Sequence, residues 1–222
     1  MSSNNTSGRL YRILSFDRAV QIFEQGELHF AQPSTWPDPY EVSLVHSNSH
    51  KLFGQCWGTR GVSDAMWRIY STNHLGVRIS TSTRKLKKAI ASELIRRGFE
   101  LRMQNVDYLN PHDLRGKVSK ISKELAENFN VQQAMDVLFL KRVAFDYESE
   151  YRVVIYCPDA TKVLARQGIK IQVDPHELID SVLLDPRAPD ELIAALSFYF
   201  KGKLKFAKRV QRSVLYKPPM GL

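Results

Sequence analysis

The sequence has little cysteine and no long apolar run. Its only two cysteines, Cys56 and Cys157, lie far apart along the 222 residues. No stretch of about eighteen residues is continuously apolar, which argues against a membrane-spanning helix. Residues 1–8 are polar, contain no hydrophobic signal region and are expected to form a disordered tail. These absences predict a cytoplasmic protein without a disulfide framework.

Metal-binding and phosphate-binding motifs are missing as well. The six histidines are scattered, and no cysteine and histidine cluster has the spacing of a zinc site. No glycine-rich loop follows a predicted strand, so neither a P-loop nor a Rossmann site is supported. Acidic residues are also in deficit, with 23 Asp and Glu against 32 Lys and Arg and a net charge of +9. This excess favours a polyanionic partner, above all nucleic acid, and no metal is expected.

Predicted strands and helices follow each other in a mixed order. Alternating or β-branched stretches predict strands at 9–14, 28–31, 52–57, 76–82, 169–173, 181–184 and 203–210. Capping signals predict helices that begin near Ser15, Ser63, Thr83, Asn110, Asn130 and Pro189, the fifth of them running to about Arg142. The mixed order predicts an α+β fold rather than a doubly wound sheet. We expect 9–222 to form a single domain, a pair of small, mostly antiparallel sheets with a mostly helical block at 83–142 packed to one side.

A proline-rich segment spans residues 33–41. Three prolines in seven residues predict a loop without regular structure. Its aromatic residues, Trp36 and Tyr40, either fill the core or line a pocket together with the acids Asp38 and Glu41.

The stretch at 147–156 reads Tyr-Glu-Ser-Glu-Tyr-Arg-Val-Val-Ile-Tyr, and its second half has the composition of a strand. Side chains alternate along a strand, so Glu148, Glu150 and Arg152 are expected on one face. Two carboxylates and a guanidinium at the entrance of a strand each need a partner or water. The stretch therefore predicts either a solvated strand edge, in which Arg152 neutralises Glu148, or a functional site.

Several segments, in this order and spacing, resemble a bacterial family of domains of unknown function, DUF2971, which is often found near defence systems. The resemblance runs from about residue 10 to 216 and rests on segments 10–12, 26–30, 36–41, 66–70, 148–154 and 213–216. The proline-rich segment departs from the family pattern, because Trp36 stands where phenylalanine is expected and Pro37 where asparagine is usual. The family implies no particular activity.

A looser resemblance connects the chain with ADP-ribosyltransferases of the Arg–Ser–Glu type. Those enzymes place an arginine on an early strand, a Ser-x-Ser at the end of a middle strand and a Glu-x-Glu where a later strand begins. This chain has Arg12, then 80–82, then 148–150 in that order, and Tyr70 would replace the middle serine as in the His–Tyr–Glu type. The resemblance implies an enzyme that cleaves NAD⁺ and transfers ADP-ribose to a macromolecule, in a toxin or phage-defence setting with an antidote or immunity protein.

The chemistry implied by this resemblance explains the residue types. Cleavage of the nicotinamide glycosidic bond develops positive charge on the ribose, which a carboxylate stabilises. Glu150 is expected in that role, and Glu148 is expected to orient or deprotonate the acceptor. Arg12 would pair with the pyrophosphate or a ribose, and Ser80 would hold Glu150 in place. The complete set implied to bind NAD⁺ is Tyr11, Arg12, Trp67, Tyr70, Ser80, Ser82 and Arg152, with Trp67 or Tyr70 stacked on nicotinamide.

Each of these residues also has a structural interpretation. Arg12 and Glu150 would form an ion pair between strands, the segment from Ser80 to Ser82 would cap the next helix, and Trp67 would belong to the core.

Two predicted helices repeat a basic bias on their outer sides. The residues expected to contact a nucleic-acid acceptor are Arg84, Lys87, Lys88, Lys117 and Lys120. The same basic surface supports a second hypothesis, a nucleic-acid-binding or nucleic-acid-processing protein that does not use NAD⁺. A third is a non-enzymatic module whose aromatic loop binds a partner. The acceptor stays open among protein, DNA, RNA and water, as does the oligomeric state.

Overall fold

A computed structural model describes residues 8–36, 38–42, 48–162 and 168–217. The predicted tail at 1–8 lies outside these residues, apart from Gly8. The chain forms two compact units. The first comprises 1–27, 59–90 and 172–222, and the second comprises 28–58 and 91–171. The single domain expected over 9–222 stays a prediction. In the described part of the chain, none of the helices combines the length and the apolar character that crossing a membrane requires.

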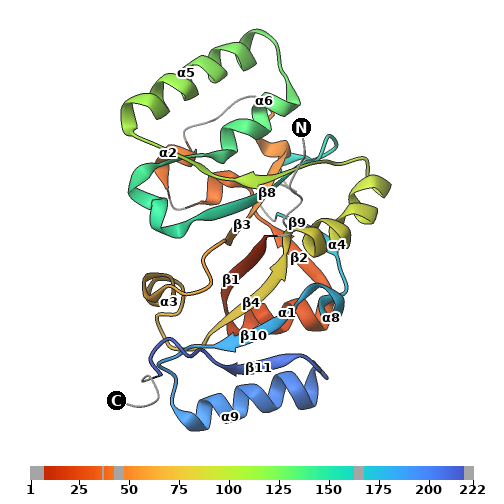
Figure 1. The fold of residues 1–222 in the computed structure, drawn as a ribbon. Coiled ribbons are helices and arrows are strands. Elements are labelled where there is room, and N and C mark those ends of the chain that lie inside the picture. Colours follow the sequence, from red (N-terminus) through yellow and green to blue (C-terminus); the bar gives the residue numbers. More distant parts are fainter. Residues whose placement is uncertain (1–7, 37, 43–47, 163–167, 218–222) are drawn as a thin grey trace, which may run out of the picture. The chain divides into compact units, whose positions relative to one another are not determined.

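The first unit contains four strands in the order β11-β10-β4-β1. They are β1 (Arg9–Ser15), β4 (Gly76–Ser82), β10 (Ser181–Leu184) and β11 (Arg209–Arg212). β4 pairs antiparallel with both β1 and β10, whereas β10 and β11 are parallel. A parallel pair needs a crossover connection, and α9 (Asp190–Phe198) lies in that connection, beside β11 (Figure 1).

One face of these strands is apolar because its residues alternate with polar ones. Leu10, Val77, Ile79 and Val182 are all buried, and the strand register places them on the same side. Helix α1 (Phe16–Gln25) contacts β1 and β4 and buries Ala19, Ile22 and Phe23. It ends at Gly26, whose φ of 63° is the left-handed conformation that favours glycine. Glycine at this position is also a helix-end signal in the sequence, so the predicted start near Ser15 and the end at Gly26 are both confirmed.

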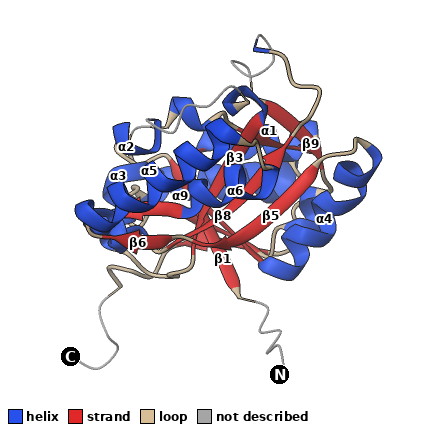
Figure 2. Ribbon diagram, turned by 90° about the horizontal axis from the view of Figure 1, so that it is seen from above, coloured by secondary structure: helices blue, strands red, loops and turns tan. Residues whose placement is uncertain are grey.

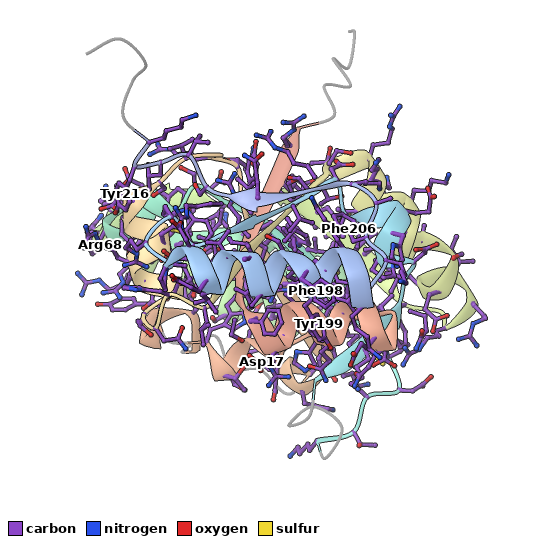
Figure 3. The ribbon with its side chains drawn as sticks, turned by 90° about the horizontal axis from the view of Figure 1, so that it is seen from below. Asp17, Arg68, Phe198, Tyr199, Phe206 and Tyr216 are labelled. Carbon is purple, nitrogen blue, oxygen red and sulfur yellow. The ribbon has the colours of Figure 1, made fainter. Side chains whose placement is uncertain are left out.

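Aromatic side chains join α1 to the C-terminal part of the first unit. Phe16 contacts Tyr199 edge-on at 5.4 Å between ring centroids, and Phe23 contacts Phe206 at 5.2 Å. Figure 3 shows Tyr199 in this region, and its hydroxyl donates a hydrogen bond to Glu24. The predicted strand at 203–210 is wrong in its position. A π-helix, η5 (Tyr199–Lys203), continues α9, and the strand β11 begins only at Arg209. Phe200 and Phe206, which precede β11, are buried in the core.

Two short helices complete the first unit. Helix α3 (Asp64–Tyr70) begins as predicted, because the Ser63 hydroxyl accepts a hydrogen bond from the Met66 amide at 3.3 Å. Its Arg68 lies 3.4 Å from the hydroxyl of Tyr216, and the two residues lie close together in Figure 3. Helix α8 (Pro175–Leu178) is capped by Asp174.

The second unit has β8 (Glu150–Tyr156) between two antiparallel neighbours. These are β3 (Leu52–Gly58) and β5 (Glu100–Asn105). The central position expected for this strand is confirmed in this unit. Two further pairs of strands are β2 (Glu27–Phe30) with β9 (Ile169–Gln172), and β6 (Asp107–Leu109) with β7 (Leu140–Arg142).

Helices cover one part of β8 in the second unit. They are α5 (Pro111–Glu127), α6 (Val131–Asp136) and the 3₁₀ helices η3 (Val137–Phe139) and η4 (Val143–Glu148). Figure 2 shows α6 over β8, which it contacts. The buried core beneath these helices includes Leu114, Leu125, Met135, Phe139 and Val154.

The mostly helical block expected at 83–142 is only partly correct. Helix α4 (Thr83–Arg96) and α5 are present, but β5, β6 and β7 also lie in this range. The helix predicted from Asn130 to about Arg142 ends at Asp136. Residues 137–139 form the buried 3₁₀ helix η3, and from Leu140 the chain pairs with β6 as β7, so that pairing with another strand ends the helix early.

The proline-rich segment forms short helices, which corrects the prediction of a loop without regular structure. Helix η1 (Pro33–Thr35) and α2 (Pro39–Val42) each begin with a proline, the position where a missing N–H costs no hydrogen bond. A third, η2 (Ser49–Lys51), precedes β3. Trp36 packs against the core of the second unit, whereas Tyr40 is exposed. The α+β class and the mostly antiparallel pairing are confirmed.

Candidate active site

Glu148 and Glu150 lie on two different elements. Glu148 is the last residue of η4, and Glu150 is the first residue of β8. Ser149 between them has a φ of 45°, a left-handed conformation that makes a tight turn. The expectation that Glu148 lies within the strand is therefore wrong, because the turn at Ser149 separates it from β8.

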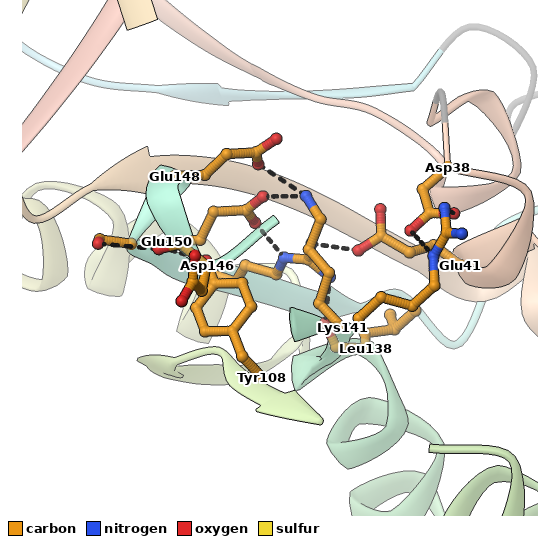
Figure 4. A network of polar contacts seen from close by, with 11 residues as sticks. Asp38, Glu41, Tyr108, Leu138, Lys141, Asp146, Glu148 and Glu150 are labelled. Atoms are coloured by element: carbon orange, nitrogen blue, oxygen red, sulfur yellow. Dashed lines mark hydrogen bonds and ion pairs between the residues drawn. The ribbon is translucent and has the colours of Figure 1, made fainter. Parts of the chain in front are cut away.

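The ammonium group of Lys141 joins the two carboxylates (Figure 4). Its Nζ donates to Glu148 Oε2 at 2.7 Å and to Glu150 Oε1 at 2.5 Å. Lys141 comes from β7, and all three residues are less than a tenth exposed. Buried charges are stable only when they are paired and hydrogen-bonded. The turn at Ser149 thus brings both acids to one shared cation.

Arg152 binds the other side of Glu150. Its Nε donates to Glu150 Oε2 at 2.6 Å, its Nη1 donates to the Leu138 carbonyl at 2.6 Å, and its Nη2 donates to Glu41 of α2. The guanidinium also stacks on the Trp36 ring, 4.5 Å from the ring centroid. The alternative in which Arg152 neutralises Glu148 is wrong, since Lys141 does so instead. Arg152 is 1% exposed, and with these contacts it fixes the position of the Glu150 carboxylate.

A second ion pair fixes the proline-rich segment. Arg142 Nη2 donates to Asp38 Oδ1 at 2.7 Å, and its guanidinium lies over the rings of Tyr40 and Phe145. Asp38 is buried, as Glu41 is. Both acids of the segment therefore bind arginines from the part of the chain that carries the glutamate pair. Figure 4 shows Asp38 and Glu41 beside the pair.

The environment moves the pKa values of the two glutamates in opposite directions. Burial, followed by the hydrogen bond with Glu150, raises the pKa of Glu148 to about 7. Burial alone would raise the pKa of Glu150 too, but the Glu148 hydrogen bond and the charges of Arg152 and Lys141 lower it below its ordinary value. At neutral pH Glu150 is thus ionised, whereas Glu148 can gain or lose a proton. Pairs of this kind supply the acid and base of many active sites.

Two further residues adjoin the glutamate pair. The Tyr108 hydroxyl accepts a hydrogen bond from the Glu150 amide at 2.8 Å, and burial raises the pKa of this phenol to about 12. Burial also raises the pKa of the Cys56 thiol to about 12. A thiol of that pKa is protonated at neutral pH and is a poor nucleophile. Glutamate chemistry is therefore the chemistry that this cluster offers.

Four of the residues predicted to bind NAD⁺ lie on β1 and β4 in the first unit. Tyr11 and Ser80 face each other across the two strands. Arg12 points to the opposite face, because side chains alternate along β1. Ser80 Oγ lies 2.6 Å from Ser181 Oγ. Ser82 accepts a hydrogen bond from the Lys85 amide, so Ser82 rather than the predicted Thr83 caps α4.

The two aromatic candidates of α3 differ in exposure. Trp67 is 1% exposed and belongs to the core, whereas Tyr70 is 47% exposed. The core interpretation of Trp67 is confirmed. The roles of Tyr70, Tyr11, Arg12, Ser80 and Ser82 in binding NAD⁺ stay predictions.

The five basic residues expected to contact an acceptor are all exposed. Arg84, Lys87 and Lys88 lie on α4, and Lys117 and Lys120 lie on α5. Their contact with nucleic acid stays a prediction. Within the described residues, no three His, Cys, Asp or Glu side chains are grouped so that they could hold a metal ion.

Sequence reasoning missed Lys141 as a member of the site. The signal that would have found it is the pair of charged residues, Lys141 and Arg142, inside the otherwise apolar stretch 137–145, where an unpaired charge is costly. The sequence identifies Glu41 only as an acid of the proline-rich segment, and no local pattern predicts its pairing with Arg152.

Comparison with known proteins gives one family and a set of distant structures. The model of the family described as "Protein of unknown function (DUF2971)" matches residues 66–153, which confirms the predicted resemblance over that range. Three structures of DarT from Thermus sp. 2.9 are similar to this chain. The complex with carba-NAD⁺ has a TM-score of 0.43 and 11% identity, and the match covers 94% of this chain and 96% of that one.

The other two DarT complexes match to the same degree. The complex with NAD⁺ has a TM-score of 0.42 and 10% identity, with 96% of this chain and 100% of that one covered. The complex with ADP-ribosylated ssDNA has a TM-score of 0.42 and 10% identity, with 96% and 97% covered. No curated protein sequence matches this one.

Proposed function

We propose that this protein is an ADP-ribosyltransferase-like enzyme that cleaves NAD⁺ and transfers ADP-ribose to a nucleic acid. The observation that carries the proposal is the glutamate pair on Lys141, in which Glu150 stays ionised while the pKa of Glu148 is near neutrality. The order of Arg12, 80–82 and 148–150 along the chain supports it. The net charge of +9 supports a nucleic acid as the acceptor.

The charge balance of the cluster suits this reaction. Three carboxylates, those of Glu41, Glu148 and Glu150, face the two cations Lys141 and Arg152. The cluster therefore carries one net negative charge when every group is ionised. That charge would stabilise a ribosyl cation next to Glu150, in a site where water does not screen it.

Each proton and electron pair has a place in the proposed reaction. The glycosidic bond of NAD⁺ breaks, and its electron pair leaves with neutral nicotinamide. The anion of Glu150 stabilises the positive charge left on the ribose. Glu148 then accepts the proton of the acceptor group as the new bond to the ribose carbon forms. Lys141 and Arg152 hold the glutamates in place throughout.

We place the activity in a toxin or phage-defence setting with an antidote or immunity protein, on the strength of the resemblance to DUF2971. A second candidate function is nucleic-acid binding without NAD⁺. It is favoured by the exposed basic residues of α4 and α5.

Labelled NAD⁺ tests the proposal against the second candidate. The full chain is incubated with NAD⁺ labelled in its adenylate phosphate, with single-stranded DNA, with RNA and with neither. Nicotinamide release and transfer of label are measured for the wild type, Glu150→Gln and the control Glu127→Gln, which changes an exposed acid of α5.

We expect Glu150→Gln to lower turnover per folded molecule by roughly two to three orders of magnitude, while Glu127→Gln stays at the wild-type rate. Nucleic-acid binding without any nicotinamide release would favour the second candidate. Full turnover by folded Glu150→Gln would end the assignment of Glu150.

A further inference from the structure

One face of the strands in the first unit is polar and basic, in contrast to the apolar face under α1. Tyr11 of β1 and Ser181 of β10 both pair with Ser80 of β4, and the register continues from Ser181 to Arg209 of β11. The described strand residues on this face are Arg9, Tyr11, Ile13, Ser15, Gly76, Arg78, Ser80, Ser82, Ser181, Leu183, Arg209 and Gln211. None of these strand residues is acidic, and three are arginines, so the face has a positive potential.

Arg78 lies in the middle of this face and has no counter-ion among the described residues. The side chain of Arg78 is half-buried. Among the described residues, its guanidinium lies over the ring of Tyr11, and the guanidinium carbon is 4.8 Å from the ring centroid. Its Nε is buried without a hydrogen-bond partner there. Burial lowers the pKa of this guanidinium. Two arginines of the second unit differ in this respect, since Arg142 and Arg152 both bind carboxylates.

A half-buried guanidinium without a carboxylate costs folding free energy. Proteins often keep such a destabilising group at a site where a ligand supplies the missing negative charge. A planar guanidinium donates two parallel hydrogen bonds to a carboxylate or a phosphate. Arg78 is therefore prepared for an anion from outside the chain.

Two hydroxyls on the same face add a neutral donor. Ser80 is two residues from Arg78 on β4, about 7 Å away along the strand. Its Oγ and that of Ser181 are 2.6 Å apart, and either can be the donor. One of the two hydroxyl protons forms the hydrogen bond between Ser80 and Ser181, and the other can be donated to a ligand. Arg9 and Arg209 are exposed at the margins of the face and attract an anion over a longer range.

We propose that this face is a phosphate-binding site, in which the Arg78 guanidinium binds the anion and the Ser80–Ser181 hydroxyl pair donates to it. Phosphate is favoured over carboxylate because its three peripheral oxygens accept from both donor groups at once. A nucleotide and a nucleic-acid backbone carry this same group. The site belongs to the first unit alone and does not require the reaction proposed for the glutamate pair.

Binding measurements on the full chain test the site. The probes are inorganic pyrophosphate, ADP-ribose and single-stranded DNA, titrated at low salt into the wild type, Arg78→Gln and Arg18→Gln. Arg18 is a matched control, because it is an exposed arginine of α1 whose Nη1 donates only to Gln21 among the described contacts. Both variants remove one positive charge.

We expect Arg78→Gln to weaken binding of at least one probe about tenfold to a hundredfold, the usual value of a charged hydrogen-bond pair. Arg18→Gln should bind as the wild type does. Binding of pyrophosphate and ADP-ribose identifies a free nucleotide as the source of the phosphate, and binding of DNA alone identifies the backbone. An equal loss in both variants, or no binding of any probe, overturns the proposal.

Thermal unfolding separates a binding role from a structural one. Arg78→Met removes the unpaired charge but keeps most of the apolar length of the side chain. If Arg78 is retained for a ligand, this variant melts at the same or a higher temperature than the wild type. A lower melting temperature means that Arg78 stabilises the fold, and overturns the proposal. Nicotinamide release is measured separately, so failure of this site and failure of the glutamate chemistry are distinguishable.

Discussion

The ammonium nitrogen of Lys141 lies 2.5 Å from a carboxylate oxygen of Glu150. The two residues belong to β7 and β8, and both are less than a tenth exposed. Because neither side chain is well solvated, the charged form of each is stabilised by the other and by their further partners, Glu148 and Arg152. The ion pair therefore links the stability of the second unit to the chemistry of Glu150.

Lys141→Met should destabilise the protein. The change leaves Glu148 without its cation and Glu150 with Arg152 alone, and breaking a buried ion pair typically costs about 3–5 kcal/mol. Urea unfolding measures the loss. The matched control is Lys117→Met on the exposed side of α5, which should change the free energy of unfolding by no more than about 0.5 kcal/mol. Equal effects of the two variants would mean that Lys141 is not held by buried charges.

Glu148 should give the reaction a pH dependence near neutrality. Its pKa in the folded protein is about 7, raised first by burial and then by the Glu150 hydrogen bond. If Glu148 is the base, the rate of ADP-ribose transfer rises with pH and levels off above about 7. Glu148→Gln should remove this rise and lower kcat more than it changes KM for NAD⁺. A pH profile with the same rise in Glu148→Gln would assign the base to another group.

The contributions of the two glutamates to the free energy of unfolding should change with pH in opposite directions. A folded-state pKa that is raised favours the protonated form, so the contribution of Glu148 is present below its ordinary pKa of 4.5 and is lost as pH rises to about 7. The pKa of Glu150 is lowered, so its contribution is present above 4.5 and is lost as pH falls below that value. Melting temperatures of Glu148→Gln and the wild type between pH 5 and 8 isolate the first effect. The difference between the two proteins should change with pH in that window, and a constant difference would contradict the raised pKa.

The features that the sequence could predict are local ones. The cap of Ser63 on α3, the end of α1 at Gly26 and the strand after Glu150 all depend on residues within one turn or one strand. The partners of Glu150 are different. Arg152 meets Glu41, which is 111 residues away in sequence, and no local pattern specifies such a pair.

The same distinction explains the error at Lys141. Residues 140–142 form a three-residue strand whose parallel partner is β6. The short apolar run 137–140 that leads into this strand is compatible with either a helix or a strand, and only pairing with a distant segment decides between them. The alternation of β8 does not extend back to Glu148, because the left-handed turn at Ser149 interrupts it.

The two aromatic residues of α3 should separate stability from ligand binding. Trp67→Ala should cost about 3–5 kcal/mol, because it empties a fully buried site. Tyr70→Ala removes a half-exposed ring, and we expect a loss of no more than about 1 kcal/mol. If Tyr70 stacks on nicotinamide, Tyr70→Ala raises KM for NAD⁺ while Tyr70→Phe keeps it. An unchanged KM in Tyr70→Ala would exclude that role.

The basic helices should determine how nucleic-acid binding depends on salt. Each phosphate that a lysine neutralises releases a counter-ion, which adds about 0.7 to the slope of log affinity against log salt for a single strand. We expect Lys117→Gln with Lys120→Gln on α5 to weaken binding of single-stranded DNA. The slope should fall by about 0.7 for each phosphate that the variant no longer neutralises.

The matched control for the α5 pair is Lys201→Gln with Lys203→Gln, two exposed lysines of η5. It removes the same charge from a helix to which no acceptor contact is assigned. Binding titrations between 50 and 200 mM salt, about the range over which phosphate contacts dominate, measure both slopes. If the α5 lysines contact DNA, only their variant has a lower slope. Equal slopes in the two double variants would mean that the net charge of +9, rather than α5, attracts the nucleic acid.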